Sequence, residues 1–347
     1  MYRNIILKFI LIMGLAICLY FVYLFSKTFF LDNTVFEEKK VYVYINEGDE
    51  FLKVRSALTP LLKSISDFSL AAQKKGYTSR VKSGKYVLEK GSNNNEIINA
   101  LRRKSLTVRV TFNNQERLEN LAGRIAKQIE PDSVSLLKAF LDPKFLLAKG
   151  FSIENILGIF LPDSYDFFWN TSAENFRDKM WISYQNFWSE NKKKKATELG
   201  LTPLEVISLA AIVQKETQKV DERPRVAGVY LNRLKRKMKL QADPTVIYAM
   251  KLQLNNFDTI IKRVLYQDLK INSPYNTYRY KGLPPSPITM PDISSINAVL
   301  NAEQHRYLYF VANPKNPGYH LFSKNAMEHN KNKKIYTNWL DRNRVYR

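Results

Sequence analysis

Glu216 is the residue of this sequence whose surroundings best suit acid–base chemistry. It lies in the segment VISLAAIVQKET, where small and apolar residues fill almost every position from Val206 to Val213. In a helix, the side chain at position 216 lies beside Leu209, Ile212 and Val213, so a carboxyl group projects from an apolar face. Burial disfavours the charged form of a carboxyl group and raises its pKa. A general acid that works near neutral pH needs such a raised pKa.

The start of this helix is also marked in the sequence. Thr202 occupies the N-cap position, Pro203 the first helical position and Glu205 the third, which together predict a capping box. The far end is open to a second interpretation. The helix could fray there, and Glu216 would then only pair with Arg223 or Arg225.

A loop rich in tyrosine, proline and amide side chains follows downstream. Its sequence is SPYNTYRYKGLPPSPI, residues 273–288. Tyrosine rings and amide groups suit stacking on sugar rings and hydrogen bonding to hydroxyl and N-acetyl groups. The prolines in and next to this loop restrict its backbone, so we expect a rigid surface.

Metal and disulfide chemistry have little support. The chain has one cysteine, Cys18, and three histidines, none of which pairs with another at helical ligand spacing. We therefore predict no metal site, no cofactor and no intrachain disulfide.

The charge balance is strongly basic. Lysine and arginine number 54, aspartate and glutamate 32, and the formal net charge is +22. Since no recognised nucleic-acid motif accompanies the charge, we expect no nucleic acid as a partner. The excess of lysine favours an anionic membrane surface or acidic wall polymers.

The N-terminal segment predicts a membrane anchor. Residues 5–25 are apolar except for Lys8, and about 20 apolar residues span a bilayer as a helix. Arg3 and Lys8 precede the apolar run, so the N-terminus should remain in the cytoplasm. A cleaved signal peptide is the alternative, but the run ends in bulky LFSKTFF instead of a small-residue cleavage site. We expect a single-pass protein of the cytoplasmic (inner) membrane with its C-terminal domains on the outer, periplasmic side.

After a membrane anchor, residues 1–30, and a linker, residues 31–40, the sequence predicts an α+β fold in two parts. Residues 41–105 contain strand, turn and helix twice, with Asp49 as a helix cap, and loosely resemble a LysM-like glycan-binding domain. Residues 106–347 are expected to form a larger mixed α+β domain. In it, residues 307–313 predict a strand and residues 320–330 a turn that enters a helix.

Six tracts in order resemble the membrane-anchored endolytic murein transglycosylases, peptidoglycan lytic enzymes sometimes called the YceG-like family. They are IVQKET, ERPRVAGVYLNRL, LQADPTVIYAM, SPYNTYRYKGLPPSPI, YLYFVAN and the HLFS…EHN ending. They cover about residues 202–330. The LPDSYDFFW stretch and the small domain extend the resemblance over most of the chain.

This resemblance implies lytic cleavage of the β-1,4 bond between N-acetylmuramic acid and N-acetylglucosamine in peptidoglycan glycan strands, which leaves 1,6-anhydro ends. It implies that Glu216, the glutamate of the E-T motif, is the catalytic acid/base. It also implies that polar side chains of these tracts line the glycan cleft: Asn232, Gln241, Asp243, Ser273, Tyr275, Asn276 and Tyr278. Each of these also has an interpretation as a helix cap or a core polar group.

Two other functions stay open. Lytic chemistry needs one essential carboxyl group, whereas most glycosidases use two, about 5–5.5 Å or 6.5–9.5 Å apart. A two-carboxylate peptidoglycan hydrolase, with Asp243 as the partner of Glu216, is the first alternative. A non-enzymatic, membrane-anchored glycan-binding protein is the second.

The family further suggests strand termination and coupling to peptidoglycan synthases through the membrane helix, which we treat as hypotheses. One departure from the family is visible. Leu157 stands before Gly158, where the family often carries a glutamate.

Overall fold

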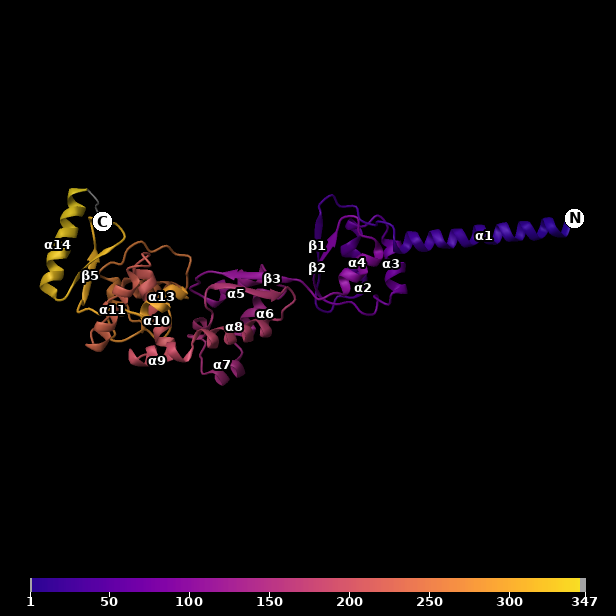
Figure 1. Cartoon of the computed structure of the whole chain (residues 1–347). Coiled ribbons are helices and arrows are strands. Elements are labelled where there is room, and N and C mark those ends of the chain that lie inside the picture. Colours follow the sequence, from indigo (N-terminus) through magenta and orange to yellow (C-terminus); the bar gives the residue numbers. More distant parts are fainter. Residues whose placement is uncertain (1, 344–347) are drawn as a thin grey trace. The chain divides into compact units, whose positions relative to one another are not determined.

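The computed structural model describes residues 2–343 and shows the mixed α+β architecture that the sequence predicts (Figure 1). The sheets are small, since β1 pairs with β2, β3 with β4 and β5 with β6, each as a two-stranded sheet. The chain divides into two compact units. Unit 1 comprises Met1–Val110, Lys127–Pro131 and Tyr165–Ser172, and unit 2 comprises Thr111–Ala126, Asp132–Ser164 and Ala173–Arg347.

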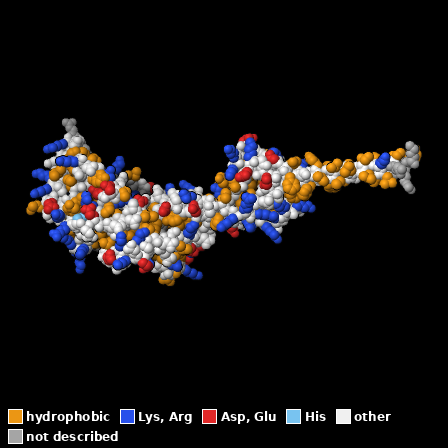
Figure 2. Space-filling view, in the orientation of Figure 1, with side chains coloured by type: hydrophobic (Ala, Val, Ile, Leu, Met, Phe, Trp, Pro, Cys, Tyr) orange, Lys and Arg blue, Asp and Glu red, His pale blue; other side chains and the backbone are white. Residues whose placement is uncertain are grey.

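The N-terminal helix α1 (Tyr2–Phe29) is long and apolar. Its segment Ile5–Phe29 has a mean hydropathy of 2.7. Figure 2 shows it as a rod covered mainly by hydrophobic side chains. At 1.5 Å per residue, its 28 residues extend about 42 Å, compared with about 30 Å for the hydrocarbon core of a bilayer. The helix is therefore long and apolar enough to span a membrane, as predicted.

Unit 1 packs helices against an antiparallel strand pair. β1 (Lys40–Ile45) and β2 (Gly84–Glu89) pair with Val43 opposite Tyr86. The helices of this unit are α2 (Phe51–Leu58), η1 (Thr59–Leu61), α3 (Ile65–Lys74) and α4 (Asn94–Arg102). Both strands and the α-helices contribute to one apolar core. Its fully buried members include Ile45, Leu58, Phe68, Tyr77 and Ile97.

Two details of unit 1 differ from expectation. Asp49 does not cap α2, because Glu50 occupies the N-cap position and Asp49 instead accepts a 2.8 Å hydrogen bond from the backbone N–H of Asn46. The helix α3 was not predicted. Its N-cap, Ser64, accepts from the backbone N–H of Asp67, and its apolar face enters the core through Phe68.

The segment of residues 31–40 is bonded into unit 1. Asn33 is buried, and its side chain accepts from the backbone N–H of Ser64 at 2.8 Å and donates to Asn94 at 2.7 Å. Asn94 in turn donates to the backbone oxygen of Thr28, near the end of α1, at 2.8 Å. Polar contacts thus join α1 to the first globular core with few free residues between them.

The boundary between the two units passes through β3 and β4. The elements of this middle part of the chain are β3 (Thr107–Phe112), α5 (Leu118–Ala126), α6 (Ser133–Phe140), α7 (Pro143–Lys149), η2 (Ile156–Ile159), β4 (Asp163–Phe168), α8 (Ala173–Phe187) and α9 (Glu190–Glu198). In unit 2, Phe140 packs on Phe160 and Phe176, with ring centroids 4.6 Å and 6.1 Å away.

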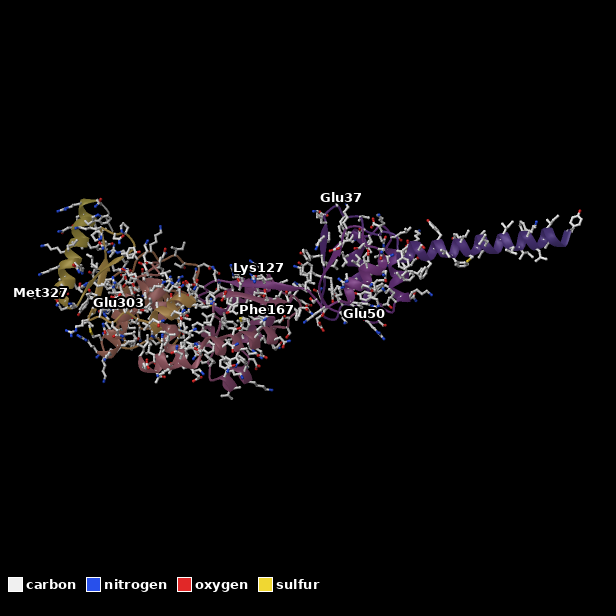
Figure 3. All side chains as sticks on the ribbon, viewed as in Figure 1. Glu37, Glu50, Lys127, Phe167, Glu303 and Met327 are labelled. Atoms are coloured by element: carbon white, nitrogen blue, oxygen red, sulfur yellow. The ribbon has the colours of Figure 1, made fainter. Side chains whose placement is uncertain are left out.

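The C-terminal part of unit 2 surrounds the helix α10. Its elements are α10 (Pro203–Glu216), α11 (Arg223–Lys235), α12 (Asp243–Leu254), η3 (Asp268–Lys270), α13 (Ile293–Leu300), β5 (Tyr309–Ala312), β6 (His320–Ser323) and α14 (Ala326–Arg342). α10 contacts α11, α12 and α13, whereas α14 packs on β5 and β6. Met327 marks the first turn of α14 in Figure 3.

One prediction for this part was wrong. Residues 320–323 form the strand β6 and not a turn, since β6 pairs antiparallel with β5 and places Phe322 opposite Phe310. Apolar residues on both strands allow this pairing. The predicted helix then begins at Ala326, after Asn325 caps it by accepting from the backbone N–H of Glu328.

Candidate active site

The helix α10 starts and runs as the sequence predicts. The side chain of Thr202 accepts from the backbone N–H of Glu205 at 3.3 Å, and Glu205 accepts from the backbone N–H of Thr202 at 2.8 Å. Every residue from Val206 to Val213 is buried. The capping box fixes where the helix begins, and the buried body holds it in place. Its last residue, Glu216, is therefore held on a rigid element.

Glu216 is half-buried and bonded to a tyrosine. The hydroxyl group of Tyr230, on α11, donates to Oε1 of Glu216 at 2.7 Å. Burial raises the pKa of Glu216 from 4.5 to about 7, and the negative charge of Asp243 adds to this. The bond from Tyr230 and the positive charge of Arg233 act in the opposite direction. The carboxyl group can therefore be protonated or charged near neutral pH.

The alternative pairing of Glu216 with an arginine is not what the structure shows. Arg223 donates to the hydroxyl group of Ser294 at 2.8 Å. Arg225 pairs with Glu303, labelled in Figure 3, at 2.9 Å. Both guanidinium groups are thus engaged elsewhere.

Glu216 opens into a cavity of about 470 Å³ within unit 2. Three of the residues that the sequence suggested for a glycan cleft line it together with Glu216, namely Gln241, Asp243 and Tyr278. The other lining residues come from α11, from the segment before α12, from β5 and from α14: Tyr230, Arg233, Leu240, Tyr309, Phe310, His329 and Lys333. The cavity therefore brings residues from distant parts of the chain together around Glu216.

Asp243 and Tyr278 form the second polar pair of this cavity. The hydroxyl group of Tyr278 donates to Oδ1 of Asp243 at 2.6 Å. Burial and the neighbouring carboxylates raise the pKa of Tyr278 above its ordinary value, so this tyrosine remains a neutral donor. Asp243 keeps a second carboxylate oxygen for other hydrogen bonds.

The backbone around Gln241 is held in an unusual conformation. Gln241 has a φ of 52°, in the left-handed region that non-glycine residues rarely adopt. Its N–H donates to the backbone oxygen of Thr277 at 3.1 Å, and the next N–H, of Ala242, donates to the hydroxyl group of Thr277 at 3.0 Å. These bonds tie the start of α12 to the tyrosine-rich loop. They place Gln241, Asp243 and Tyr278 together.

Arg233 performs a similar bracing role. Its guanidinium group donates to the backbone oxygens of Leu308 at 2.6 Å and Leu240 at 2.8 Å. One side chain thereby connects α11, the segment before α12 and the start of β5. Its positive charge lowers the pKa of Glu216, while its Nε and Nη1 donate to carbonyl oxygens.

The chain is similar to known proteins over most of its length. Residues 43–335 match the YceG-like family. The chain belongs to the YceG-like family. The chain is 31% identical over 336 residues to a Bacillus subtilis protein named endolytic murein transglycosylase, covering 90% of this chain and 89% of that protein. It is 27% identical to a Streptococcus pneumoniae protein of the same name, covering 85% of this chain but 58% of that longer protein.

A solved structure supports the YceG-like fold. The crystal structure of a yceG-like protein from Listeria monocytogenes superposes with a TM-score of 0.55 at 28% sequence identity. The match covers 84% of this chain and 98% of the Listeria chain.

The other residues suggested for the cleft lie outside the Glu216 cavity of this YceG-like protein. Asn276 is fully buried and donates to the backbone oxygens of Leu269 and Ile271, each at 2.9 Å. The hydroxyl group of Tyr275 bonds that of Ser286 at 2.6 Å. These two side chains therefore brace the tyrosine-rich loop from within.

Asn232 and Ser273 also face other surroundings. The amide group of Asn232 donates to the backbone oxygens of His305 at 2.9 Å and Tyr307 at 3.0 Å. The hydroxyl group of Ser273 accepts from the backbone N–H of Tyr275 at 3.3 Å. Both side chains are therefore engaged in hydrogen bonds to nearby backbone groups.

Sequence reasoning missed several cavity residues, above all Tyr230, Arg233 and His329. Tyr230 and Arg233 lie three residues apart on one face of α11, and both are buried. The available signal was their spacing from Val226, which places an arginine on the apolar face of this helix. His329 gave no signal, because its partners lie on β5 and α11.

The departure from the family pattern lies away from the cavity. Leu157 belongs to η2 and is buried, with 6% of its surface exposed. A Cβ atom at the neighbouring Gly158 would lie 2.9 Å from a terminal methyl group of Leu204. No group of three or more His, Cys, Asp or Glu side chains arranged as metal ligands occurs among residues 2–343.

Proposed function

We propose that this protein is an endolytic murein transglycosylase. Glu216 carries the proposal, because its pKa of about 7, its place in a polar cavity and the names of the YceG-like relatives all favour one acid/base carboxyl group. The proposed substrate is the glycan strand of peptidoglycan. The bond that breaks is the β-1,4 bond from N-acetylmuramic acid to N-acetylglucosamine.

The proposed reaction has two proton transfers, one from Glu216 and one back to it. Protonated Glu216 donates to the glycosidic oxygen, and the bond from that oxygen to C1 of the muramyl residue breaks. The resulting carboxylate accepts the proton of the muramyl C6 hydroxyl group, whose oxygen bonds to C1. The products are a free N-acetylglucosamine end and a 1,6-anhydro muramyl end. Glu216 regains its proton, and no water is consumed.

Tyr230 supports the first proton transfer of this cycle. Its hydrogen bond to Oε1 stabilises the charged form of Glu216 after the first proton transfer. The raised pKa of Tyr230 keeps its own proton in place, so it acts as a donor and not as a competing acid. Asp243, bonded by Tyr278, is suited to accept hydrogen bonds from sugar hydroxyl groups.

A second candidate function is a two-carboxylate peptidoglycan hydrolase. Asp243 favours it, because this carboxylate lines the same cavity as Glu216. Mass spectrometry of fragments released from purified sacculi separates the two. Anhydro muramyl ends support the transglycosylase. Reducing muramyl ends that carry oxygen from labelled water would show that the protein is the hydrolase instead.

We further propose how the chain is placed in the cell. Arg3 and Lys8 precede the apolar run, so α1 would span the cytoplasmic membrane with its N-terminus inside. Residues 41–105 would then serve as a LysM-like glycan-binding domain, and residues 106–347 as the catalytic domain, both outside. Cleavage of nascent strands beside the membrane would terminate their elongation.

Two experiments address this placement. A cysteine introduced at Glu38, which is exposed and lies beyond α1, should react with a membrane-impermeant reagent added from outside, and protection of that cysteine would reverse the proposed orientation. If α1 couples the protein to peptidoglycan synthases, a pull-down with the full chain should recover these synthases. A pull-down in which residues 1–30 are replaced by an unrelated anchor should not. Equal recovery would exclude coupling through the helix.

A further inference from the structure

Two side chains of α14 enter the Glu216 cavity, and the proposed proton transfers use neither. His329 and Lys333 lie one helical turn apart and line the same space as Glu216 and Asp243. α14 packs on β5 and β6, which supply Tyr309 and Phe310 to the cavity. The helix therefore presents two nitrogen-bearing side chains to the cavity.

The ring of His329 is held in one orientation. It stacks on Tyr309 with ring centroids 5.1 Å apart and planes 22° from parallel. Its Nδ1 is enclosed and has no hydrogen-bond partner. A buried N–H group without an acceptor is costly, so the proton belongs on the other ring nitrogen, Nε2. Burial and the positive charges of Lys333 and Arg233 lower the pKa of His329, which keeps the ring a neutral N–H donor.

Lys333 is the cation of this cavity whose donors remain available. Its side chain is exposed, and it has no carboxylate within ion-pair distance among residues 2–343. Nε and Nη1 of Arg233, the other cation, already donate to the backbone oxygens of Leu308 and Leu240. An ammonium group beside an N–H donor is a site for an anionic oxygen.

We propose that His329 and Lys333 form a subsite that binds a carboxylate group of the murein strand. The inference rests on the proposed function and names the part of the substrate that this side of the cavity recognises. Carboxylates on murein come from two sources. They are the lactyl group of a muramyl residue without a peptide, and the acidic residues of the stem peptide. Lys333 supplies the charge and His329 a directed hydrogen bond.

The test compares Lys333→Gln with Lys334→Gln in the full-length protein in detergent. Lys334 is an exposed lysine of the same helix that does not line the cavity, so both variants lose one charge. Cleavage is measured on peptide-bearing strands, on peptide-free strands and on peptide-free strands whose carboxyl groups are methyl esters. Thermal melting of each variant shows that it is folded.

We expect Lys333→Gln to raise KM about fivefold on carboxylate-bearing strands, with kcat retained, and to have no effect on the esters. A defect confined to peptide-bearing strands identifies the stem peptide as the source, and a defect on peptide-free acid strands identifies the lactyl group. Equal KM values for Lys333→Gln and Lys334→Gln on all three substrates overturn the subsite. Absence of cleavage by the wild-type protein instead overturns the proposed function.

His329 is tested by two substitutions. His329→Phe keeps a ring on Tyr309 but removes the N–H donor, so KM should rise as for Lys333→Gln. His329→Gln retains an N–H donor and should restore part of the affinity. Equal KM values for both variants and the wild type would remove His329 from the subsite.

Discussion

The hydroxyl group of Tyr230 donates a 2.7 Å hydrogen bond to Oε1 of Glu216, which joins the end of α10 to the middle of α11. This bond favours the charged carboxylate, whereas burial and the nearby Asp243 favour the neutral acid. The balance leaves the pKa of Glu216 at about 7. A group that must first give and then take a proton needs both forms to be accessible near neutral pH.

Replacing Glu216 by glutamine should abolish cleavage with little change in structure. Glutamine keeps the shape of the side chain but can neither donate nor accept the transferred proton. General acid–base catalysis contributes a factor of about 10²–10⁴, so we expect a loss of that order in kcat, measured by release of soluble fragments from sacculi. Glu198→Gln, at an exposed position of α9, is the matched control and should retain full activity. Normal cleavage by Glu216→Gln would remove Glu216 from its role.

Tyr230→Phe should move the pH profile of cleavage to higher pH. The rate should fall as the pH rises through the pKa of Glu216, about 7, because the first step needs the protonated acid. Without the Tyr230 donor the carboxylate form is less stable, so this pKa rises. We expect the alkaline limb of kcat/KM to move up by about one pH unit. If the alkaline limb of kcat/KM and the rate are both unchanged in Tyr230→Phe, the hydrogen bond from Tyr230 does not affect the pKa of Glu216.

Asp243→Asn should move the alkaline limb of kcat/KM to lower pH. The negative charge of Asp243 raises the pKa of Glu216, so a neutral side chain at that position lowers this pKa. In the lytic mechanism the variant still cleaves and still produces anhydro ends, with the alkaline limb at lower pH. A loss of all cleavage in Asp243→Asn, with a normal melting temperature, would favour the two-carboxylate hydrolase.

The sequence could predict those parts of this site that depend on residues close together in the chain. The apolar face beside Glu216 and the capping box of α10 arise within one helix, so spacing alone reveals them. The contacts of His329 with Tyr309 and of Arg233 with Leu308 join residues 20 and 75 positions apart. Such contacts depend on how α11, β5 and α14 pack, and no local pattern specifies that packing.

The tyrosine-rich loop shows a second limit. Its composition indicated many polar groups for sugar recognition. However, Asn276 donates to the backbone oxygens of Leu269 and Ile271, just before the loop, and Tyr275 bonds Ser286. An irregular loop must satisfy its own buried backbone groups, and the residue types that do so are those that bind sugars. Only the direction of each side chain separates the two uses, and Tyr278 is the tyrosine of this loop that lines the Glu216 cavity.

The raised pKa of Glu216 also predicts how stability depends on pH. Its pKa is about 7 in the folded chain against 4.5 for a free side chain, so between these values the folded state binds the extra proton. Stability should therefore fall as the pH rises from about 4.5 through 7, by up to about 3 kcal/mol.

Glu216→Gln removes this titration and supplies the measurement. Its melting temperature should exceed that of the wild type by about 5–10 °C at pH 8, and the difference should shrink towards pH 5. Glu198→Gln, which is exposed, should follow the wild type at both values. A difference that does not change with pH would mean that Glu216 is not strained in its charged form.

Gly84 provides a test of the packing in unit 1. It opens β2 with a φ of 144°, and a Cβ atom there would lie 2.5 Å from the side chain of Ser105. Gly84→Ala combines a backbone conformation that alanine avoids with a steric clash, so we expect a loss of about 2–4 kcal/mol in the free energy of unfolding of this unit. Gly91→Ala is the matched control, because Gly91 has a φ of 83° but open space around it. Its loss should be about 1 kcal/mol. Denaturant unfolding followed by the fluorescence of Trp169, in variants whose other tryptophans are phenylalanine, measures both. Equal losses at the two positions would show that Ser105 moves away at no cost.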